Sequence, residues 1–150
     1  MIRLSEGVNQ EQLMALYADP YIAKVGHDHR IAAPIVHPQV CYCSAWVDNR
    51  FAGAFMAIRG AIDWELHALL YRWALPWSRD LGRAFLRWAF SHPINRVTAQ
   101  IIEGLEMART YCLRLGFKQE GVKRQACLQN GVFRDVYLLG MLRSEYELCI

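Results

Sequence analysis

A junction between a strand and an amphipathic helix in mid-chain has the residue types of an anion-binding site. It reads Ala74-Leu-Pro-Trp-Ser-Arg79-Asp-Leu-Gly82-Arg-Ala84. The first backbone N–H groups of a helix have no partners within the helix, and the helix dipole favours negative charge there. Gly82 would let a phosphate approach the backbone closely. The alternative is an ordinary helix start whose small residue packs against a sheet.

A second candidate site lies on the strand before this junction, where Glu65 and His67 are two residues apart. Side chains two apart on a strand point to the same side, so this pair could relay a proton directly or through water. The pair therefore has the chemistry of a general base. The alternative is that Glu65 and His67 simply line the more polar face of a half-exposed strand.

Two further groups have weaker claims to a function. A set of histidines and cysteines within 17 residues could bind zinc, but its spacing matches none of the usual structural frames and no CxxC is present. The aromatic segment from Trp64 to Trp77, with arginines between, could stack nucleobases, although an aromatic core under a sheet explains it better. We therefore expect neither a metal nor a nucleic acid as a ligand. The group of histidines and cysteines that was considered for zinc comprises His27, His29, His37, Cys41 and Cys43.

The first half of the chain predicts one short helix and three consecutive strands. Residues 9–18 have apolar side chains at helical spacing behind a possible Asn9 cap, and Asp19-Pro20 ends the run. Residues 40–47 and 51–58 are strand-like, with a turn at 48–50. Residues 62–74 are expected to form a third strand, bent or bulged.

The second half alternates helices and strands. From Arg79 the apolar period is that of a helix that ends near His92-Pro93, and residues 96–102 form a strand. A second helix carries a stripe of Leu105, Ala108, Cys112 and Leu115, and Gly116 provides its left-handed cap. Residues 117–128 and 132–142 flank Asn130-Gly131, a strong hairpin signal. The element order predicts an α/β fold with a mixed sheet.

The length and composition of the chain indicate a single globular domain. The chain has 150 residues, 54% hydrophobic and 21% charged, which fits a single globular domain over residues 1–150. Its longest apolar run, residues 51–58, is too short for a membrane span, and its start lacks a signal-peptide core, so we expect a cytoplasmic protein. Five scattered cysteines favour reduced thiols.

The net charge of +3 is too small for a duplex-DNA binder and suits a small polyanionic ligand.

The spacing Arg79-x-x-Gly82-x-Ala84 resembles the acetyl-CoA pyrophosphate loop of the GNAT N-acetyltransferase superfamily, (Q/R)-x-x-G-x-(G/A). Pro76 lies where that family often has a proline, and residues 108–121 resemble its passage from a helix into a strand, LGF followed by EG. Arg124, Asn130-Gly131, residues 135–137 and residues 143–145 are similar to the tail of the branch that acetylates ribosomal-protein N-termini. The resemblance covers residues 62–146.

This resemblance implies a GNAT-like acyl-CoA N-acyltransferase fold, with a sheet splayed between two central strands and a C-terminal hairpin. It implies acetyl-CoA as co-substrate and an amine acceptor, a small molecule or a peptide N-terminus, with a homodimer left open. The backbone at Arg72, Trp73 and Ala74 would bind the acetyl and pantetheine units. The pyrophosphate would lie at the loop of Arg79, Asp80, Leu81, Gly82, Arg83 and Ala84. Beside this resemblance, the Glu65 and His67 pair found from strand alternation is the candidate base.

The sequence departs from the family at the expected proton donor for the leaving thiolate. Cys112 stands where many members have a tyrosine, Tyr111 comes one residue earlier, and Leu105 takes the place of a common asparagine. Tyr111 and Cys112 are therefore the candidate acids. Two functions follow. The first is an N-acetyltransferase in which the amine attacks the thioester directly in a ternary complex. The second is a catalytically inactive binding or assembly protein of the same fold, since the compact, Trp-rich form also resembles a phage-encoded group linked with head assembly.

Overall fold

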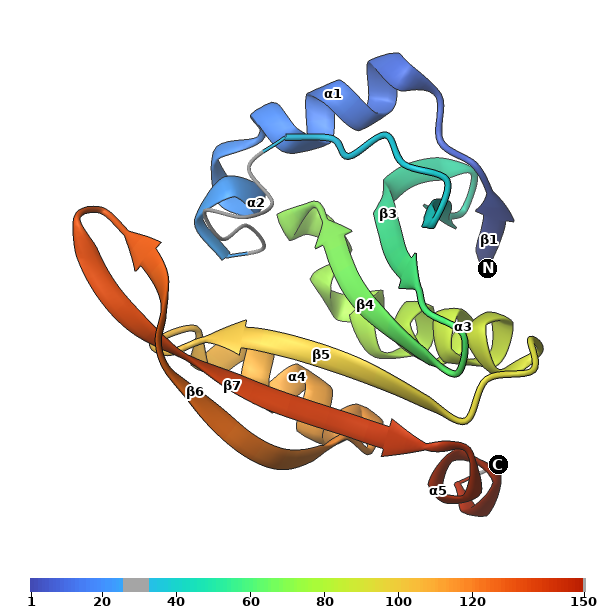
Figure 1. Cartoon of the computed structure of the whole chain (residues 1–150). Helices are drawn as coiled ribbons and strands as arrows, with labels where there is room; N and C mark the ends of the chain where they lie inside the picture. The colour runs from blue at the N-terminus through green and yellow to red at the C-terminus, as the bar shows by residue number, and fades with distance from the viewer. Residues whose placement is uncertain (26–32, 150) are drawn as a thin grey trace.

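Seven strands form one mixed sheet in the order β1-β2-β3-β4-β5-β7-β6 (Figure 1). The computed structural model describes residues 1–25 and 33–149. All neighbouring strands of this sheet are antiparallel except β4 and β5, which run parallel. The strands are β1 (Ile2–Glu6), β2 (Val40–Val47), β3 (Arg50–Arg59), β4 (Asp63–Leu70), β5 (Arg96–Ile102), β6 (Lys118–Gln129) and β7 (Val132–Leu142).

Helices lie on both faces of the sheet. Figure 1 shows α1 and α2 beside the N-terminal half, with α3 and α4 behind β4 and β5. One core cluster, with Phe55, Phe85 and Leu139, packs under α3 and α4, and a second, with Leu16, Met56 and Leu69, packs under α1 and α2. The helices are α1 (Gln10–Ala18), α2 (Pro20–Val25), the 3-10 helix η1 (Arg72–Trp77), α3 (Ser78–Phe90), α4 (Glu106–Leu115) and α5 (Arg143–Leu148). None of the helices in the described part of the chain is long and apolar enough to cross a membrane.

The parallel pair β4 and β5 separates after a short contact. Its last register pair joins Glu65 to Thr98, and the rest of both strands diverges towards their C-terminal ends (Figure 1). Strand β4 stays paired with β3, and β5 stays paired with β7. The sheet is therefore splayed at its centre, as the family resemblance implies, and the opening is bounded by backbone edges that do not pair with each other.

Most of the expected elements form for the expected local reasons. Asn9 caps α1, because its side chain accepts a hydrogen bond from the Gln12 N–H at 2.7 Å. The three strands β2, β3 and β4 form a meander. Gly116 ends α4 with a φ of 108°, and Asn130 and Gly131 both have positive φ in the β6–β7 hairpin.

The expectation of a strand over residues 62–74 is wrong at its C-terminal end. Strand β4 stops at Leu70, which forms the last register pair with Gly53 of β3. The Ala74 N–H donates to the Tyr71 carbonyl at 2.9 Å, so the chain turns into η1. Pro76 inside η1 has no N–H to offer a sheet.

Three short elements were not expected. Strand β1 pairs with β2 at the sheet edge, and α5 follows β7 directly. Helix α2 begins at Pro20, the residue predicted to end a helix, because Asp19 caps it by accepting from the Ile22 N–H at 3.0 Å. Each is six residues or fewer, so its apolar pattern is too short to recognise from sequence.

Candidate active site

An inner cavity of about 110 Å³ lies where β4 and β5 separate. Its walls come from both strands and from α3 and α4, and most of the lining side chains are apolar. His67 and Gln100 bring polar groups to it from the two strands. A site of this kind, apolar with a few convergent polar groups, suits a small ligand or a reacting group held away from water.

An outer cavity of about 470 Å³ adjoins the inner one. It is lined by α2, the end of β4, η1, the first turn of α3 and α4, and it reaches Ser78, Arg79 and Arg114. Both cavities are lined by Ala68, Ala108 and Tyr111. The two spaces therefore adjoin, along a path from a mouth at the start of α3, where Arg79, Arg114 and Glu106 bring two positive charges and one negative charge, to the polar groups between the strands.

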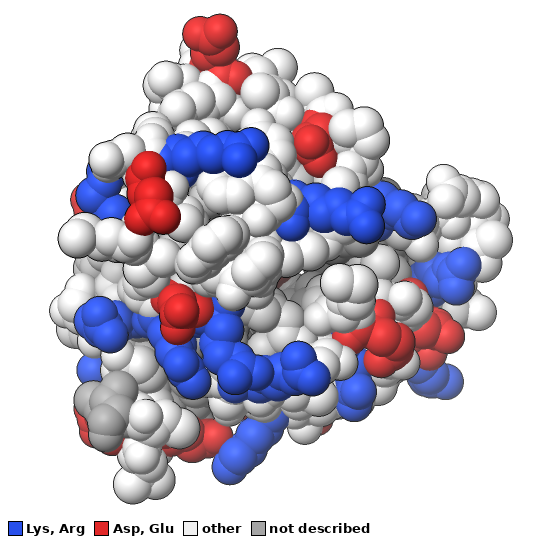
Figure 2. Space-filling view, turned by 180° about the vertical axis from the view of Figure 1, so that it is seen from behind, with Lys and Arg blue, Asp and Glu red and all other residues white. Residues whose placement is uncertain are grey.

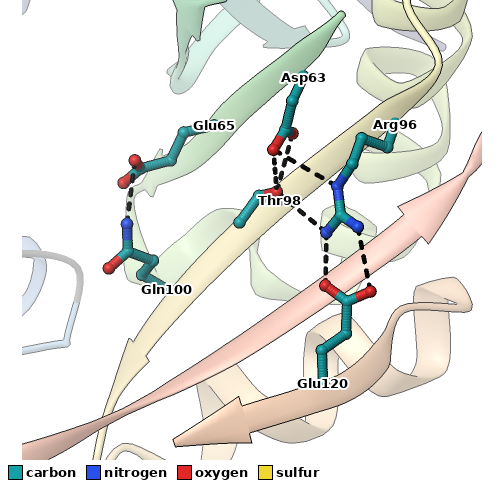
Figure 3. A network of polar contacts seen from close by, with 6 residues as sticks. All are labelled: Asp63, Glu65, Arg96, Thr98, Gln100 and Glu120. Carbon is teal, nitrogen blue, oxygen red and sulfur yellow. Dashed lines mark hydrogen bonds and ion pairs between the residues drawn. The ribbon is translucent and has the colours of Figure 1, made fainter. Parts of the chain in front are cut away.

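The predicted pair Glu65 and His67 is in direct contact. The His67 Nε2 atom lies 2.8 Å from Glu65 Oε1. Gln100 of β5 donates from Nε2 to the other carboxylate oxygen, Glu65 Oε2, at 3.1 Å (Figure 3). Both side chains of the pair are largely buried, with 10% of the His67 side chain and 24% of the Glu65 side chain exposed. The pair thus lies at the point where the sheet opens.

The space beside Gly82 is filled by another part of the chain. A Cβ atom at position 82 would overlap the Tyr111 hydroxyl and would lie 2.9 Å from Leu115 Cδ1. The Tyr111 hydroxyl donates to the Ser78 carbonyl in the first turn of α3 at 2.9 Å. The small residue therefore serves the packing of α3 against α4, and not packing against the sheet as the alternative for this junction expected.

The other residues of the expected pyrophosphate loop point in different directions. Arg79 lines the outer cavity, whereas Leu81 is fully buried in the core. Asp80, Arg83 and Ala84 line a separate groove between the chain start and the outer side of α3, where Asp80 and Arg83 lie 3.8 Å apart. Figure 2 shows that Lys and Arg side chains on this side of the molecule form several groups with acidic side chains between them. Of the six residues expected in the loop, Arg79 lines the outer cavity and Gly82 lines the inner one, and the other four line neither.

The three residues expected to offer strand N–H groups lie in η1. Ala74 is fully buried, and its N–H is already bonded to the Tyr71 carbonyl. Trp73 packs beside Trp77 at 6.2 Å, with the Arg50 guanidinium 3.9 Å above its ring. Arg72 is exposed at the start of η1. The strand edge that borders the opening is instead Leu66–Leu70 of β4, beyond the last β4–β5 pair.

Tyr111 and Cys112 both line the inner cavity. Burial raises the pKa of the Cys112 thiol to about 12. Burial also raises the pKa of the Tyr111 phenol above its ordinary value, with a smaller effect from Cys112. Both groups therefore stay protonated at neutral pH, and both are weak acids.

A second polar network holds β4 and β5 together at the closed end of the opening (Figure 3). Thr98 donates to Asp63 at 2.8 Å, and the Arg96 Nε atom lies 3.4 Å from Asp63 Oδ2. Arg96 also pairs with Glu120 of β6, with Nη1 3.1 Å from Oε2. A Cβ at Gly140 of β7 would overlap both partners, so this glycine lets the ion pair cross the intervening strand.

Among solved structures, the chain resembles the spermidine N-acetyltransferase from Vibrio cholerae in complex with CoA and spermine. The TM-score is 0.81 at 14% sequence identity, over 97% of this chain and 98% of that chain. A chimera of the same enzyme, SpeG, with hSSAT matches with a TM-score of 0.78 at 14% identity, over 97% and 98% of the two chains. The fold is the GNAT fold. No protein-family model matches the sequence, and no curated protein matches it.

Within the GNAT fold, two polar side chains of the site were not anticipated from the sequence. Gln100 alternates with buried Ala99 on β5, which suggests a polar face, but its contact with Glu65 depends on the pairing of distant strands. Arg114 joins Arg79 at the outer cavity because α4 packs beside α3. Both are consequences of tertiary structure.

The histidine and cysteine group lies only partly within the described residues. His27 and His29 lie outside them. Among the residues that the structure describes, no three His, Cys, Asp or Glu side chains are grouped so that they could hold a metal ion. Cys41 and Cys43 lie on β2, where burial raises the pKa of the Cys43 thiol to about 12.

Proposed function

We propose that this chain is an acetyl-CoA-dependent N-acetyltransferase that transfers acetyl to a primary amine by direct attack in a ternary complex. The observation that carries the proposal is the opening between β4 and β5. It joins the basic start of α3 to a contacting carboxylate–imidazole pair through two adjoining cavities. The GNAT fold, and the acetyltransferases that share it, support this function.

The residues along the path fit acetyl-CoA. The side chains of Arg79 and Arg114 would bind phosphate at the outer cavity, together with first-turn N–H groups of α3 beyond Ser78, whose own N–H donates to the Leu75 carbonyl. The free edge of β4 beyond Glu65 would offer backbone groups to an extended pantetheine arm. Bound acetyl-CoA supplies an activated acetyl thioester, which would lie in the inner cavity. Tyr111 borders both cavities, so its side chain must shift for a ligand to occupy the whole path.

His67 and Glu65 would remove the proton from the attacking amine. An ionised carboxylate can only accept hydrogen bonds, so the Glu65 contact leaves the proton of a neutral His67 ring on Nε2. The Nδ1 atom is then the basic nitrogen of the ring. The acceptor would be a small amine or a peptide N-terminus, and the tail motifs that resemble the ribosomal-protein branch favour the second.

A covalent acetyl-enzyme intermediate does not fit the site. Cys112 is the cysteine that lines the inner cavity, and with a pKa of about 12 its nucleophilic thiolate is scarce at neutral pH. Proton donation to the departing thiolate is also uphill from Tyr111 or Cys112, since an ordinary thiol has a pKa of about 8.5. Direct attack by the amine needs no thiolate nucleophile from the enzyme, so it suits these residues better than a two-step route through an acetyl-enzyme.

An acetyl-transfer assay tests the proposed function. The full chain is incubated with acetyl-CoA and a panel of amines that includes spermidine and a peptide with a free N-terminus. Release of the CoA thiol and the mass of the product are measured. We expect transfer to at least one amine. His67→Ala should lower turnover about 100-fold, within the range for loss of a general base, while acetyl-CoA affinity stays within about twofold.

His37→Ala is the matched control, because His37 is exposed and its ring accepts a hydrogen bond from Gln39 away from the opening. Its turnover should equal that of the wild type. Absence of both thiol release and acetylated product with every amine would overturn the enzyme proposal.

A second candidate function is a GNAT-fold protein that binds without transferring, in a role such as phage head assembly. The filled space beside Gly82 and the weak acids Tyr111 and Cys112 favour it. Binding of CoA without any transfer would support this candidate over the enzyme.

A further inference from the structure

The Glu65 carboxylate is held from two sides by different strands. His67, on the same strand, contacts Oε1, and Gln100, on β5, donates to Oε2. Glu65 also forms the last β4–β5 register pair, opposite Thr98, and Gln100 lies two residues further along β5. The amide therefore reaches the carboxylate from the part of β5 that has already separated from β4 (Figure 3).

This contact fixes the orientation of the carboxylate. A carboxylate held at one oxygen can rotate about its terminal torsion, which has a broad energy profile. A second hydrogen bond to the other oxygen opposes that rotation and keeps Oε1 directed at His67. With Glu65 and His67 largely buried, a lost donor is replaced by water only partly.

The chemical type of residue 100 suits this task. An amide N–H donates a hydrogen bond without bringing a positive charge. A lysine or arginine there would compete with the imidazole for the carboxylate and would lower the basicity of Glu65 strongly. An amide orients the carboxylate and leaves its charge available to His67.

The neighbouring residue Thr98 offers a comparison within the same strand. It is on the same face of β5 as Gln100, and it donates to Asp63 rather than to Glu65. Thr98 and Gln100 therefore lie on the same face of the same strand and each donate to a β4 carboxylate, but Thr98 does not contact the Glu65–His67 pair.

We propose that Gln100 is a positioning residue for the Glu65–His67 pair, holding the carboxylate so that the His67 ring keeps its proton on Nε2 and presents Nδ1 as the base. The part of this inference that concerns catalysis rests on the proposed acetyltransferase function. The part that concerns the imidazole tautomer rests on the two hydrogen bonds and does not depend on acetyl transfer.

Two measurements on the full chain test the inference. Nitrogen-15 NMR of labelled histidine reports which ring nitrogen of His67 carries the proton, without any need for activity. Steady-state acetyl transfer then gives kcat and the KM for acetyl-CoA. Both are compared for the wild type, Gln100→Met and the control Gln119→Met. Methionine keeps a similar length and removes the donor, and Gln119 is exposed on β6, where its amide oxygen accepts from Arg109 away from the opening.

In Gln100→Met the Nε2–H share of neutral His67 should fall measurably, and kcat should drop about tenfold with an unchanged KM for acetyl-CoA. Gln119→Met should match the wild type in both readouts. A tautomer ratio that is the same in wild type and Gln100→Met overturns the inference, and so does an equal change in Gln119→Met. A shifted tautomer in a chain that transfers no acetyl would support the positioning of His67 and refute the proposed function instead.

Discussion

At the scale of single residues, the chemistry of the opening depends on burial. Cys112 and Tyr111, the candidate proton donors, line the inner cavity, and burial there favours their neutral forms. Gly82 is small because Tyr111 lies against it, so a large substitution there would disturb the packing of α3 against α4. A test of phosphate binding is therefore better placed at Arg79, which is exposed at the mouth.

Alkylation rates should reveal the buried thiols. With a pKa of about 12, Cys112 and Cys43 would each hold about one thiolate in 10,000 at pH 8, against roughly a quarter for an ordinary thiol. Cys149 is exposed and should react first with iodoacetamide. Peptide mass spectrometry after timed labelling measures each site. Labelling of Cys112 as fast as Cys149 in the native chain would show that the thiol is neither buried nor protonated as described.

At the scale of elements, the Arg96–Glu120 pair joins β5 to β6 across β7. The hydrogen bond from Arg96 lowers the pKa of Glu120. The carboxylate therefore contributes stability above its unfolded pKa of about 4.3, and this contribution is lost as the pH falls through the lower folded value. Since 42% of the Glu120 side chain is exposed, we expect only about 0.2 to 1 kcal/mol from the pair.

Glu120→Gln should lower the free energy of unfolding by that amount at pH 7, and the difference from the wild type should shrink as the pH falls below about 4. Urea titrations at several pH values measure it. Glu147→Gln is the control, because Glu147 lies 3.8 Å from Arg143 on an exposed turn of α5. A Glu120→Gln deficit that is constant from pH 3 to 7 would contradict the ion-pair account.

The sequence predicts elements well where the signal is local. Asn9, Gly116 and the Asn130-Gly131 turn each specify a backbone conformation by themselves, and the corresponding boundaries are confirmed. The predicted end of β4 was wrong because residues 71–74 are apolar enough to continue a strand. Only the register with β3 shows that the pairing ends at Leu70. The Glu65–His67 contact followed from strand alternation, whereas Gln100 required the tertiary structure.

At the scale of the whole molecule, the candidate site lies where the two central strands of the sheet separate. Parallel strands β4 and β5 are tied at one end by Asp63, Thr98 and Arg96, and they separate beyond Glu65. The helix that follows β4 begins at the mouth of this opening, so a phosphate at its first turn and an acetyl group at His67 would lie on one path. The charge of Arg79 at the mouth is the feature that a polyanionic co-substrate would use.

Isothermal titration calorimetry with acetyl-CoA tests this central claim most directly, using wild type, Arg79→Glu and Arg87→Glu. Both arginines are exposed on α3, but Arg87 lines the groove on the outer side of the helix. We expect the wild type to bind, Arg79→Glu to bind at least about tenfold more weakly, and Arg87→Glu to stay within about twofold. No heat of binding at millimolar acetyl-CoA, or equal weakening by both substitutions, would contradict the account.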